Sequence, residues 1–91
     1  MKVFQKIYKV VSGIPKGEVM SYKQVADIVG TTPRVVGFAL HANKDPKNIP
    51  CHRVIKSNGT LAKGYAFGGK EKQKELLKKE GIILYGFSIY P

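Results

Sequence analysis

The sequence has little of what disulfide-stabilised, metal-binding or membrane-spanning proteins need. It has one cysteine, Cys51, in 91 residues, which excludes an intramolecular disulfide framework and suits a reducing compartment. Cys51, His41 and His52 are the only soft metal ligands, so we expect no metal site. No apolar run is long enough to span a membrane, and the first residues lack a signal-peptide pattern. We therefore expect a cytoplasmic protein with no membrane association.

Acidic residues are also scarce. Six Asp and Glu stand against sixteen Lys and Arg, giving a net charge of +10, and such an excess favours a polyanionic partner, most simply nucleic acid. The lysines of residues 70–79 fit a solvated surface equally well, whereas the two arginines, Arg34 and Arg53, are informative because they are rare. Hydrophobic residues make up 43% of the chain, enough for one compact core. We expect residues 1–91 to form a single domain, with no separate N-terminal domain.

The spacing of apolar residues predicts a first helix and then a pair of short helices. Residues 4–11 carry an apolar stripe at i, i+3, i+4 and i+7. Ser21 is a typical N-cap whose capping box Gln24 completes, and Gly30 is placed to end that second helix. Its inner face is predicted to consist of Tyr22, Val25, Ile28 and Val29.

A third helix is predicted to begin at Pro33, capped by Thr31 or Thr32. Its inner face would be formed by Val36, Ala39, Leu40 and Asn43. Two short helices joined by a tight turn are typical of a helix-turn-helix unit, whose second helix usually enters a DNA groove. Arg34 lies at the exposed start of that helix. Arg34 alone fits a surface charge as well as a nucleic-acid contact.

After a loop over residues 41–50, short extended segments replace the helices. Val54 and Ile55 favour a strand, residues 57–59 a hairpin turn and residues 60–61 its return strand, which together would form a wing. A glycine-rich loop follows at residues 63–69, and its spacing excludes a phosphate-binding loop. We expect no nucleotide cofactor.

A fourth helix is predicted over residues 70–80, with Leu76 and Leu77 inward and Gly81 at its end. Residues 82–84 would return to the core as a strand or an extended tail. The predicted fold class is α+β and mainly helical, a winged helix-turn-helix-like domain with a short hairpin.

The most distinctive stretch is Pro50-Cys51-His52-Arg53-Val54-Ile55. A thiol attacks only as thiolate, and its ordinary pKa of about 8.5 leaves a few per cent ionised at neutral pH. A neighbouring imidazole or guanidinium raises that fraction. A lone cysteine is, however, most often a small buried hydrophobe, and adjacent side chains on a strand point to opposite faces. Read alone, the stretch leaves both interpretations open.

Several segments together resemble the C-terminal domain of the O6-alkylguanine-DNA alkyltransferases. Besides residues 50–55, these are Gly17-Glu18-Val19-Met20-Ser21-Tyr22-Lys23-Gln24-Val25-Ala26, Pro33-Arg34-Val35-Val36-Gly37, Asn43, and the helix end from Leu76 to Gly81. The segments occur in the family's order and cover nearly the whole chain. The resemblance implies a protein that turns an alkylated guanine out of duplex DNA and moves the alkyl group to its own cysteine, once and without a cofactor.

The resemblance also implies roles for individual residues. Cys51 would be the alkyl acceptor, His52 its base acting through a water, and Glu80 the group that orients the imidazole, while Asn43 would connect the helix-turn-helix to the active-site loop. Arg34 would fill the gap left by the flipped base, and Tyr22 would press on the backbone beside it. The DNA-binding set is Ser21, Tyr22, Thr32, Arg34 and Val35. The substrate pocket would be lined by Pro50, Val54, Tyr65 and Phe67, with the carbonyls of Cys51 and Val54 reading the guanine amino group.

Ordinary structural explanations exist for several of these residues. Tyr22 fits a core aromatic, Asn43 a helix C-cap and Glu80 a solvated acid at a helix end, while Arg53 is expected to be a structural contact. The chain also departs from the family pattern. Many members carry an N-terminal domain, Lys47 and Asn48 occupy a usually apolar segment, Phe38 replaces a small residue, and the glycine-rich loop aligns imperfectly.

Other functions remain open at this point. A lesion sensor of the alkyltransferase-like type shares the fold, but those proteins carry a different residue, commonly tryptophan, where Cys51 stands. A winged helix-turn-helix regulator leaves residues 50–55, Asn43 and Glu80 unexplained. A thiol hydrolase is disfavoured because nothing marks an oxyanion hole. The expected partner is double-stranded DNA containing O6-alkylguanine, bound by a monomer.

Overall fold

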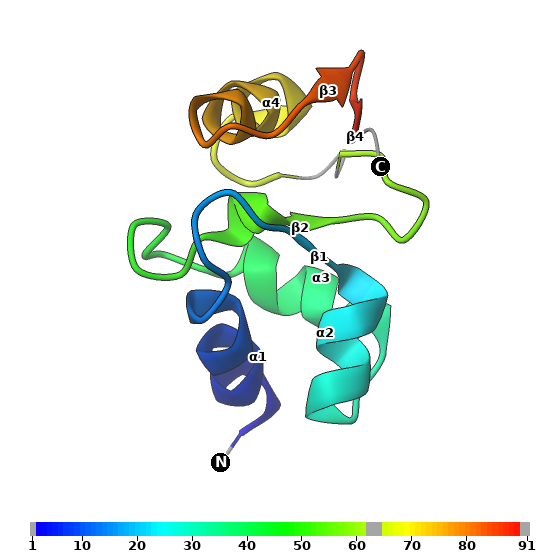
Figure 1. The fold of residues 1–91 in the computed structure, drawn as a ribbon. Helices are drawn as coiled ribbons and strands as arrows, with labels where there is room; N and C mark the ends of the chain where they lie inside the picture. Colours follow the sequence, from blue (N-terminus) through cyan, green and yellow to red (C-terminus); the bar gives the residue numbers. More distant parts are fainter. Residues whose placement is uncertain (1, 62–64, 90–91) are drawn as a thin grey trace.

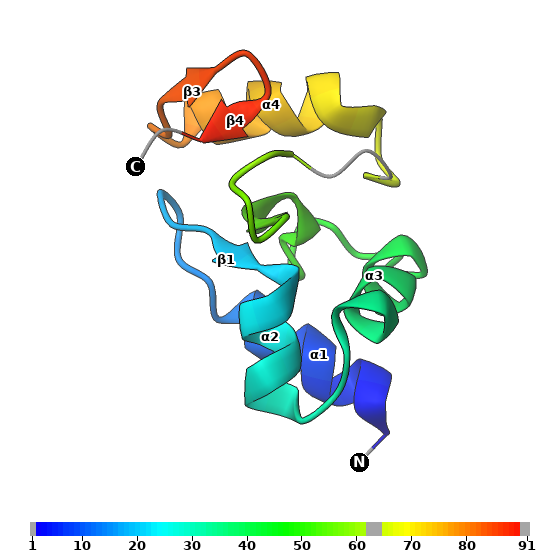
Figure 2. The ribbon, with the colours of Figure 1, turned by 90° about the vertical axis from the view of Figure 1, so that its right-hand side faces the viewer.

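A computed structural model of the protein describes residues 2–61 and 65–89 and shows a mainly helical α+β fold, as predicted. Three helices pack on one another: α1 (Val3–Ser12), α2 (Tyr22–Val29) and α3 (Pro33–His41). A short parallel pair of strands lies beside them: β1 (Met20–Ser21) and β2 (Val54–Ile55). On the far side of that pair are helix α4 (Gly69–Lys79) and the antiparallel strands β3 (Leu84–Tyr85) and β4 (Ser88–Ile89). Figure 1 and Figure 2 show this layered order.

The predicted helix-turn-helix is present, and its local signals act as expected. The Ser21 side chain accepts a hydrogen bond from the Gln24 amide, and the Ser21 amide donates one to Gln24 Oε1, so the capping box is complete. Gly30 ends α2 in the left-handed region at φ +87°, where glycine has no steric cost. Thr32 caps α3, and Pro33 occupies its first turn. These caps set the angle at which α3 leaves the turn.

The predicted inner face of α2 is wrong at one residue, Ile28. Val25 and Ala26 are buried, whereas Ile28 is 62% exposed. The inward stripe is Tyr22, Val25, Ala26 and Val29, spaced i, i+3, i+4 and i+7, and Ile28 lies off it. The short side chain of Ala26 fits the close packing of α2 on α1 and α3.

The predicted wing has different strand partners. The chain does turn at residues 57–59, and the Lys56 amide donates to the Thr60 carbonyl, but β2 pairs in parallel with β1 through Met20↔Val54 and Ser21↔Ile55. Thr60 bridges to Ser88 instead. The Asn58 side chain takes the Thr60 amide at 3.1 Å, so that amide is unavailable to β2. The regular hairpin is β3–β4.

The first residues of the stretch at 50–55 form no strand. Cys51–Arg53 make a single 3₁₀ turn, η1, and only Val54 and Ile55 are extended. The turn packs against α4. Two apolar clusters meet here: one built on α1, α2 and α3 reaches Cys51 and Val54, and the other joins Ile55 and Leu61 to Leu77 of α4. The predicted inward position of Leu77 is confirmed, with no exposed surface. Lys63 and Gly64 of the predicted glycine-rich loop lie outside the described residues.

Candidate functional site

Cys51 begins η1 and is 4% exposed. The Asn43 amide nitrogen donates to the Ile49 carbonyl at 2.9 Å, and the Asn43 oxygen accepts from the Asp45 amide at 2.9 Å. Both of these side-chain bonds of buried Asn43 are made within the loop that follows α3, and the predicted connection of the helix-turn-helix to the active-site loop stays a prediction. Burial raises the pKa of the Cys51 thiol, and a hydrogen bond from Asn43 partly opposes that rise. The thiol is therefore mostly protonated at neutral pH.

A cavity of about 20 Å³ lies beside the thiol. Its lining consists of Tyr22, Gly37, Leu40, His41, Cys51, Tyr65 and Ala66. This is space for about one water molecule and too little for a nucleobase. Of the predicted pocket residues, Tyr65 lines the cavity and packs edge-on against Phe67, with ring centroids 5.9 Å apart. Pro50, Val54 and Phe67 are absent from the lining, although Pro50 and Val54 are buried.

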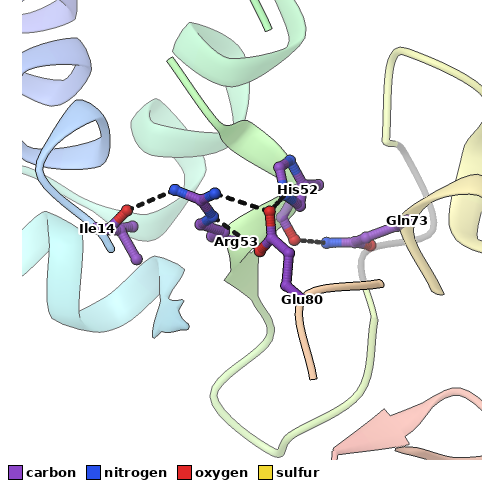
Figure 3. Close-up of polar contacts among 5 residues, drawn as sticks. All are labelled: Ile14, His52, Arg53, Gln73 and Glu80. Carbon is purple, nitrogen blue, oxygen red and sulfur yellow. Dashed lines mark hydrogen bonds and ion pairs between the residues drawn. The ribbon is translucent and has the colours of Figure 1, made fainter. Parts of the chain in front are cut away.

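Glu80 lies against the imidazole of His52, as predicted (Figure 3). Its Oε2 is 2.9 Å from His52 Nε2. Both side chains are largely buried, 9% exposed for His52 and 11% for Glu80. Hydrogen bonds from Arg53 hold the pKa of Glu80 at about 2, against the smaller opposing effect of its burial. An ionised carboxylate only accepts, so His52 Nε2 is the donor in this contact, and in a neutral imidazole Nδ1 is then the acceptor.

Arg53 makes more contacts than the sequence predicts. Its Nε and Nη2 donate to the two oxygens of Glu80, at 2.9 and 2.7 Å. Its Nη1 donates to the carbonyl of Ile14 at 2.7 Å, which ties the loop after α1 to the same carboxylate. Only a planar guanidinium offers these donors in a fixed fork. The expected structural contact is confirmed, and it is made to the carboxylate that contacts His52 (Figure 3).

Gln73 of α4 was missed by the sequence reading. It has no exposed surface, and its amide nitrogen donates to the carbonyls of His52 and Val54 at 2.9 and 3.0 Å. Helical spacing carried a usable signal, because Gln73, Leu77 and Glu80 lie at i, i+4 and i+7 and share one face. A polar residue on the inward face of a helix points to a buried partner.

The end of α4 fixes the position of Glu80. The Gly81 amide donates to the Lys78 carbonyl, and the Ile82 amide donates to the Leu77 carbonyl. These two bonds form a Schellman motif, which needs a left-handed residue at Gly81, here with φ +90°. The chain reverses immediately after Glu80, so the carboxylate is held on the η1 side of the helix. Figure 3 shows Glu80 pointing at His52 and Arg53.

The predicted DNA-binding residues gather at the start of α3 and α2. Arg34 and Tyr22 border two hollows, of about 480 and 430 Å³. The first is otherwise lined by Lys23, Pro33, Gly37, Lys56, Ser57 and Asn58. Tyr22 is half-buried, and burial raises its pKa to about 12. Ser21 and Thr32 act as helix caps, and Val35 packs partly against the core.

Within residues 2–61 and 65–89, no cluster of His, Cys, Asp and Glu is arranged to hold a metal ion. In the same part of the chain, no helix is long and apolar enough to cross a membrane.

The family model described as the DNA-binding domain of 6-O-methylguanine DNA methyltransferase matches residues 2–82. The chain belongs to this family. It is 51% identical over 76 residues to a methylated-DNA–protein-cysteine methyltransferase of Saccharolobus solfataricus, covering 84% of the chain and 48% of that relative. A relative of the same name from Pyrobaculum aerophilum is 48% identical over 71 residues, covering 78% of the chain and 47% of the relative. The chain spans about half the length of these curated relatives.

Solved structures agree with this membership. Schizosaccharomyces pombe Atl1, in complex with damaged DNA containing O6-carboxymethylguanine, is similar with a TM-score of 0.82 and 36% identity, covering 93% of this chain and 83% of that one. Mycobacterium tuberculosis OGT in complex with DNA gives a TM-score of 0.81 and 37% identity, covering 89% of this chain and 49% of that one. The same fold therefore occurs in DNA complexes of both proteins.

Proposed function

We propose that this protein repairs O6-alkylguanine in duplex DNA by moving the alkyl group, once and irreversibly, to Sγ of Cys51. The observation that carries the proposal is the contact of 2.9 Å between His52 and Glu80, immediately after the only cysteine of the chain. The family membership and the relatives' names support the same reaction. The curated relatives that carry the methyltransferase name are about twice as long as this chain, and we propose the same activity for the chain itself.

His52 supplies the base that Cys51 needs. Because burial raises the pKa of the thiol, the thiolate does not form readily by itself at neutral pH. With Nε2–H directed at Glu80, Nδ1 takes the thiol proton through one water molecule. The anionic Glu80 then stabilises the imidazolium that results. Arg53 keeps Glu80 ionised and holds its orientation.

The transfer step forms one bond and breaks one. The thiolate attacks the alkyl carbon, the C–S bond forms, and the bond between that carbon and O6 of guanine breaks with its electron pair going to the base. A proton neutralises the guanine, which is restored. Since a thioether is a poor leaving group and the structure holds no second thiol, Cys51 is used once.

The base reaches Cys51 only after leaving the duplex. Arg34, exposed at the start of α3, fills the space in the base stack, and Tyr22 supports the backbone beside it. The Val54 carbonyl, which accepts a hydrogen bond from Gln73 at 3.0 Å, would read the guanine amino group, as the family resemblance implies. Because the cavity at Cys51 is small, Tyr65 and Ala66 must move outward when the base enters.

A second candidate is a lesion sensor that binds the flipped base without reacting. The observation in its favour is the structural similarity to Atl1, with a TM-score of 0.82 and 36% identity. Cys51 and its His52–Glu80 pair favour transfer instead, because a sensor needs neither.

Intact-mass measurement separates the two candidates. The protein is incubated with a duplex containing O6-methylguanine, and the expected result is a mass gain of one methylene, absent in Cys51→Ala. Binding of the duplex without any mass gain would refute transfer and support the sensor. Absence of both binding and mass gain would refute both.

A further inference from the structure

Helix α3 exposes one large aromatic side chain. Its inward face consists of Val36, Ala39 and Leu40, all buried. Phe38 points outward and is 55% exposed. Arg34, Phe38 and His41 lie at i, i+4 and i+7, so they form a single exposed row along the helix. Leaving a phenyl ring in water is unfavourable, and packing of the protein does not explain its position.

The Phe38 ring lies beside the guanidinium of Arg34. Arg34 Cζ is 5.6 Å from the ring centroid, within the range of a cation–π contact. Both side chains border the hollow of about 430 Å³, together with Tyr22, Gly37, His41 and Ala42. The residue proposed to fill the base stack therefore has an aromatic ring directly next to it.

Gly37 is a second observation at the same place. A Cβ added there would meet no atom within 4 Å, and α3 is regular helix at this position. Glycine inside a helix costs roughly 0.5–1 kcal/mol relative to alanine, so neither backbone conformation nor internal packing explains it. Because Gly37 has no side chain, a partner can approach the backbone of α3 closely beside Arg34 and Phe38.

The charges around this surface identify the partner as duplex DNA. Arg34 and Lys56 border the adjoining hollow of about 480 Å³ together with Lys23, which pairs with Asp27 at 3.0 Å, and the chain carries a net charge of +10. Phosphates pair with these cations, and an exposed ring between them meets the bases or sugars.

We propose that Phe38 is a base-stacking residue of this DNA-binding face. When the target nucleotide leaves the duplex, the bases beside the gap lose a stacking neighbour. Arg34 enters the gap, and the ring of Phe38 packs flat against a base that borders it. The inference rests on the nucleotide flipping in the proposed function and adds a residue and a contact to it. Aromatic stacking on one base corresponds to about a tenfold change in affinity.

Binding is tested in Cys51→Ala protein, where transfer does not consume the complex. Phe38→Ala, Phe38→Leu and Phe38→Tyr are compared on duplexes with O6-methylguanine and a fluorescent 2-aminopurine on either side of it. We expect Phe38→Ala to weaken binding about tenfold and Phe38→Tyr to leave it nearly unchanged. In one of the two duplexes, 2-aminopurine should be quenched by Phe and Tyr and bright with Ala and Leu.

Controls distinguish stacking from general effects. Ile28→Ala removes an apolar side chain that is 62% exposed and lines neither hollow, and it should change neither affinity nor fluorescence. Phe38→Ala should lower affinity without altering the salt slope, whereas Arg34→Ala should reduce that slope. Equal affinity and fluorescence for all Phe38 variants in both duplexes would overturn the proposal.

An indirect role through Arg34 is tested on a duplex with an abasic site, where no base has to be flipped. If Phe38→Ala still weakens binding in an Arg34→Ala background, the ring contacts DNA itself. If its effect disappears there, Phe38 acts only by orienting Arg34, and the proposal is wrong. Transfer from free O6-benzylguanine, measured with Cys51 intact, reports separately on the proposed function and should be unaffected by Phe38→Ala.

Discussion

Glu80 is the residue on which we expect the chemistry of this site to depend most. Its carboxylate binds His52 at 2.9 Å and Arg53 through two bonds of 2.7 and 2.9 Å. A carboxylate paired only with His52 would compete for the proton that the imidazole is needed to carry. Arg53 prevents this by holding the pKa of Glu80 at about 2. The ionised carboxylate accepts from Nε2, which favours the neutral tautomer that has Nδ1 as its acceptor.

The lowered pKa of Glu80 predicts a pH-dependent contribution to stability. The folded pKa, about 2, lies below the unfolded value of about 4.3, so the contribution is fully present above the unfolded pKa and is lost as pH falls toward 2. Its size is on the order of 3 kcal/mol. Urea unfolding from pH 6 to pH 2.5 should show this loss in the unmodified protein and not in Glu80→Gln. Glu71→Gln, which also removes an exposed acid from α4, is the control and should keep the loss. A Glu80→Gln profile parallel to that of the unmodified protein would contradict the assignment.

At the scale of elements, local sequence signals predict the helices, but they do not predict which elements contact one another. Capping by Ser21 with Gln24, and Gly30 at the end of α2, are decided within a few residues, so the helix-turn-helix was predictable. The partner of β2 was not, because two β-branched residues favour a strand without specifying its neighbour. The same holds for the site: the pairing of His52 with Glu80 came from a family resemblance, and Gln73 and the fork of Arg53 appear only when α4 packs on η1.

Gln73 should connect α4 to the residues that follow Cys51, and its loss should affect both stability and transfer. Replacing it with Leu keeps the volume approximately and leaves the carbonyls of His52 and Val54 without their donor. We expect a loss of about 1–3 kcal/mol in the free energy of unfolding and slower alkyl transfer from duplex DNA. Lys78→Ala, exposed on the same helix, should change neither. Urea unfolding measures the stability and single-turnover assays measure the transfer rate. An unchanged transfer rate in Gln73→Leu would show that transfer does not need the hydrogen bonds to the two carbonyls.

Helix α3 should act on the duplex rather than on the chemistry. Arg34 borders both hollows and does not line the cavity at Cys51. Arg34→Ala is therefore expected to slow transfer from an O6-methylguanine duplex at least tenfold, because the flipped state loses the side chain that fills the stack, and to leave transfer from the free base unchanged. Equal slowing with both substrates would remove Arg34 from the flipping step.

At the scale of the whole molecule, helices α2 and α3 lie on one side of the segment that carries Cys51, and α4 lies on the other side (Figure 2). The residues from η1 bridge them: His52 and Arg53 bind Glu80 at the end of α4, and Arg53 also binds the loop after α1. Opening of the cavity for a base therefore has to leave this bridge intact, and movement is expected on the side of Tyr65 and Ala66.

The charge of the whole molecule predicts strong salt dependence of DNA binding. With a net charge of +10, lysines and arginines that contact phosphates release counterions on binding, and affinity falls about tenfold between 50 and 200 mM salt for every two phosphates contacted. Undamaged duplexes of different sequence should bind almost equally, because phosphate contacts carry no sequence information. Titrations by fluorescence anisotropy at several salt concentrations measure both properties; an affinity independent of salt would contradict this use of the charge.

The central claim is that Cys51 accepts one alkyl group and is then spent. Its most direct test is a titration of the protein with an excess of O6-methylguanine duplex, followed by intact-mass and fragment-mass measurement of the product. We predict a plateau at one methyl group per protein molecule, located on Cys51, with no further repair after the plateau. Continued turnover, or a methyl group on any other residue, would contradict the account.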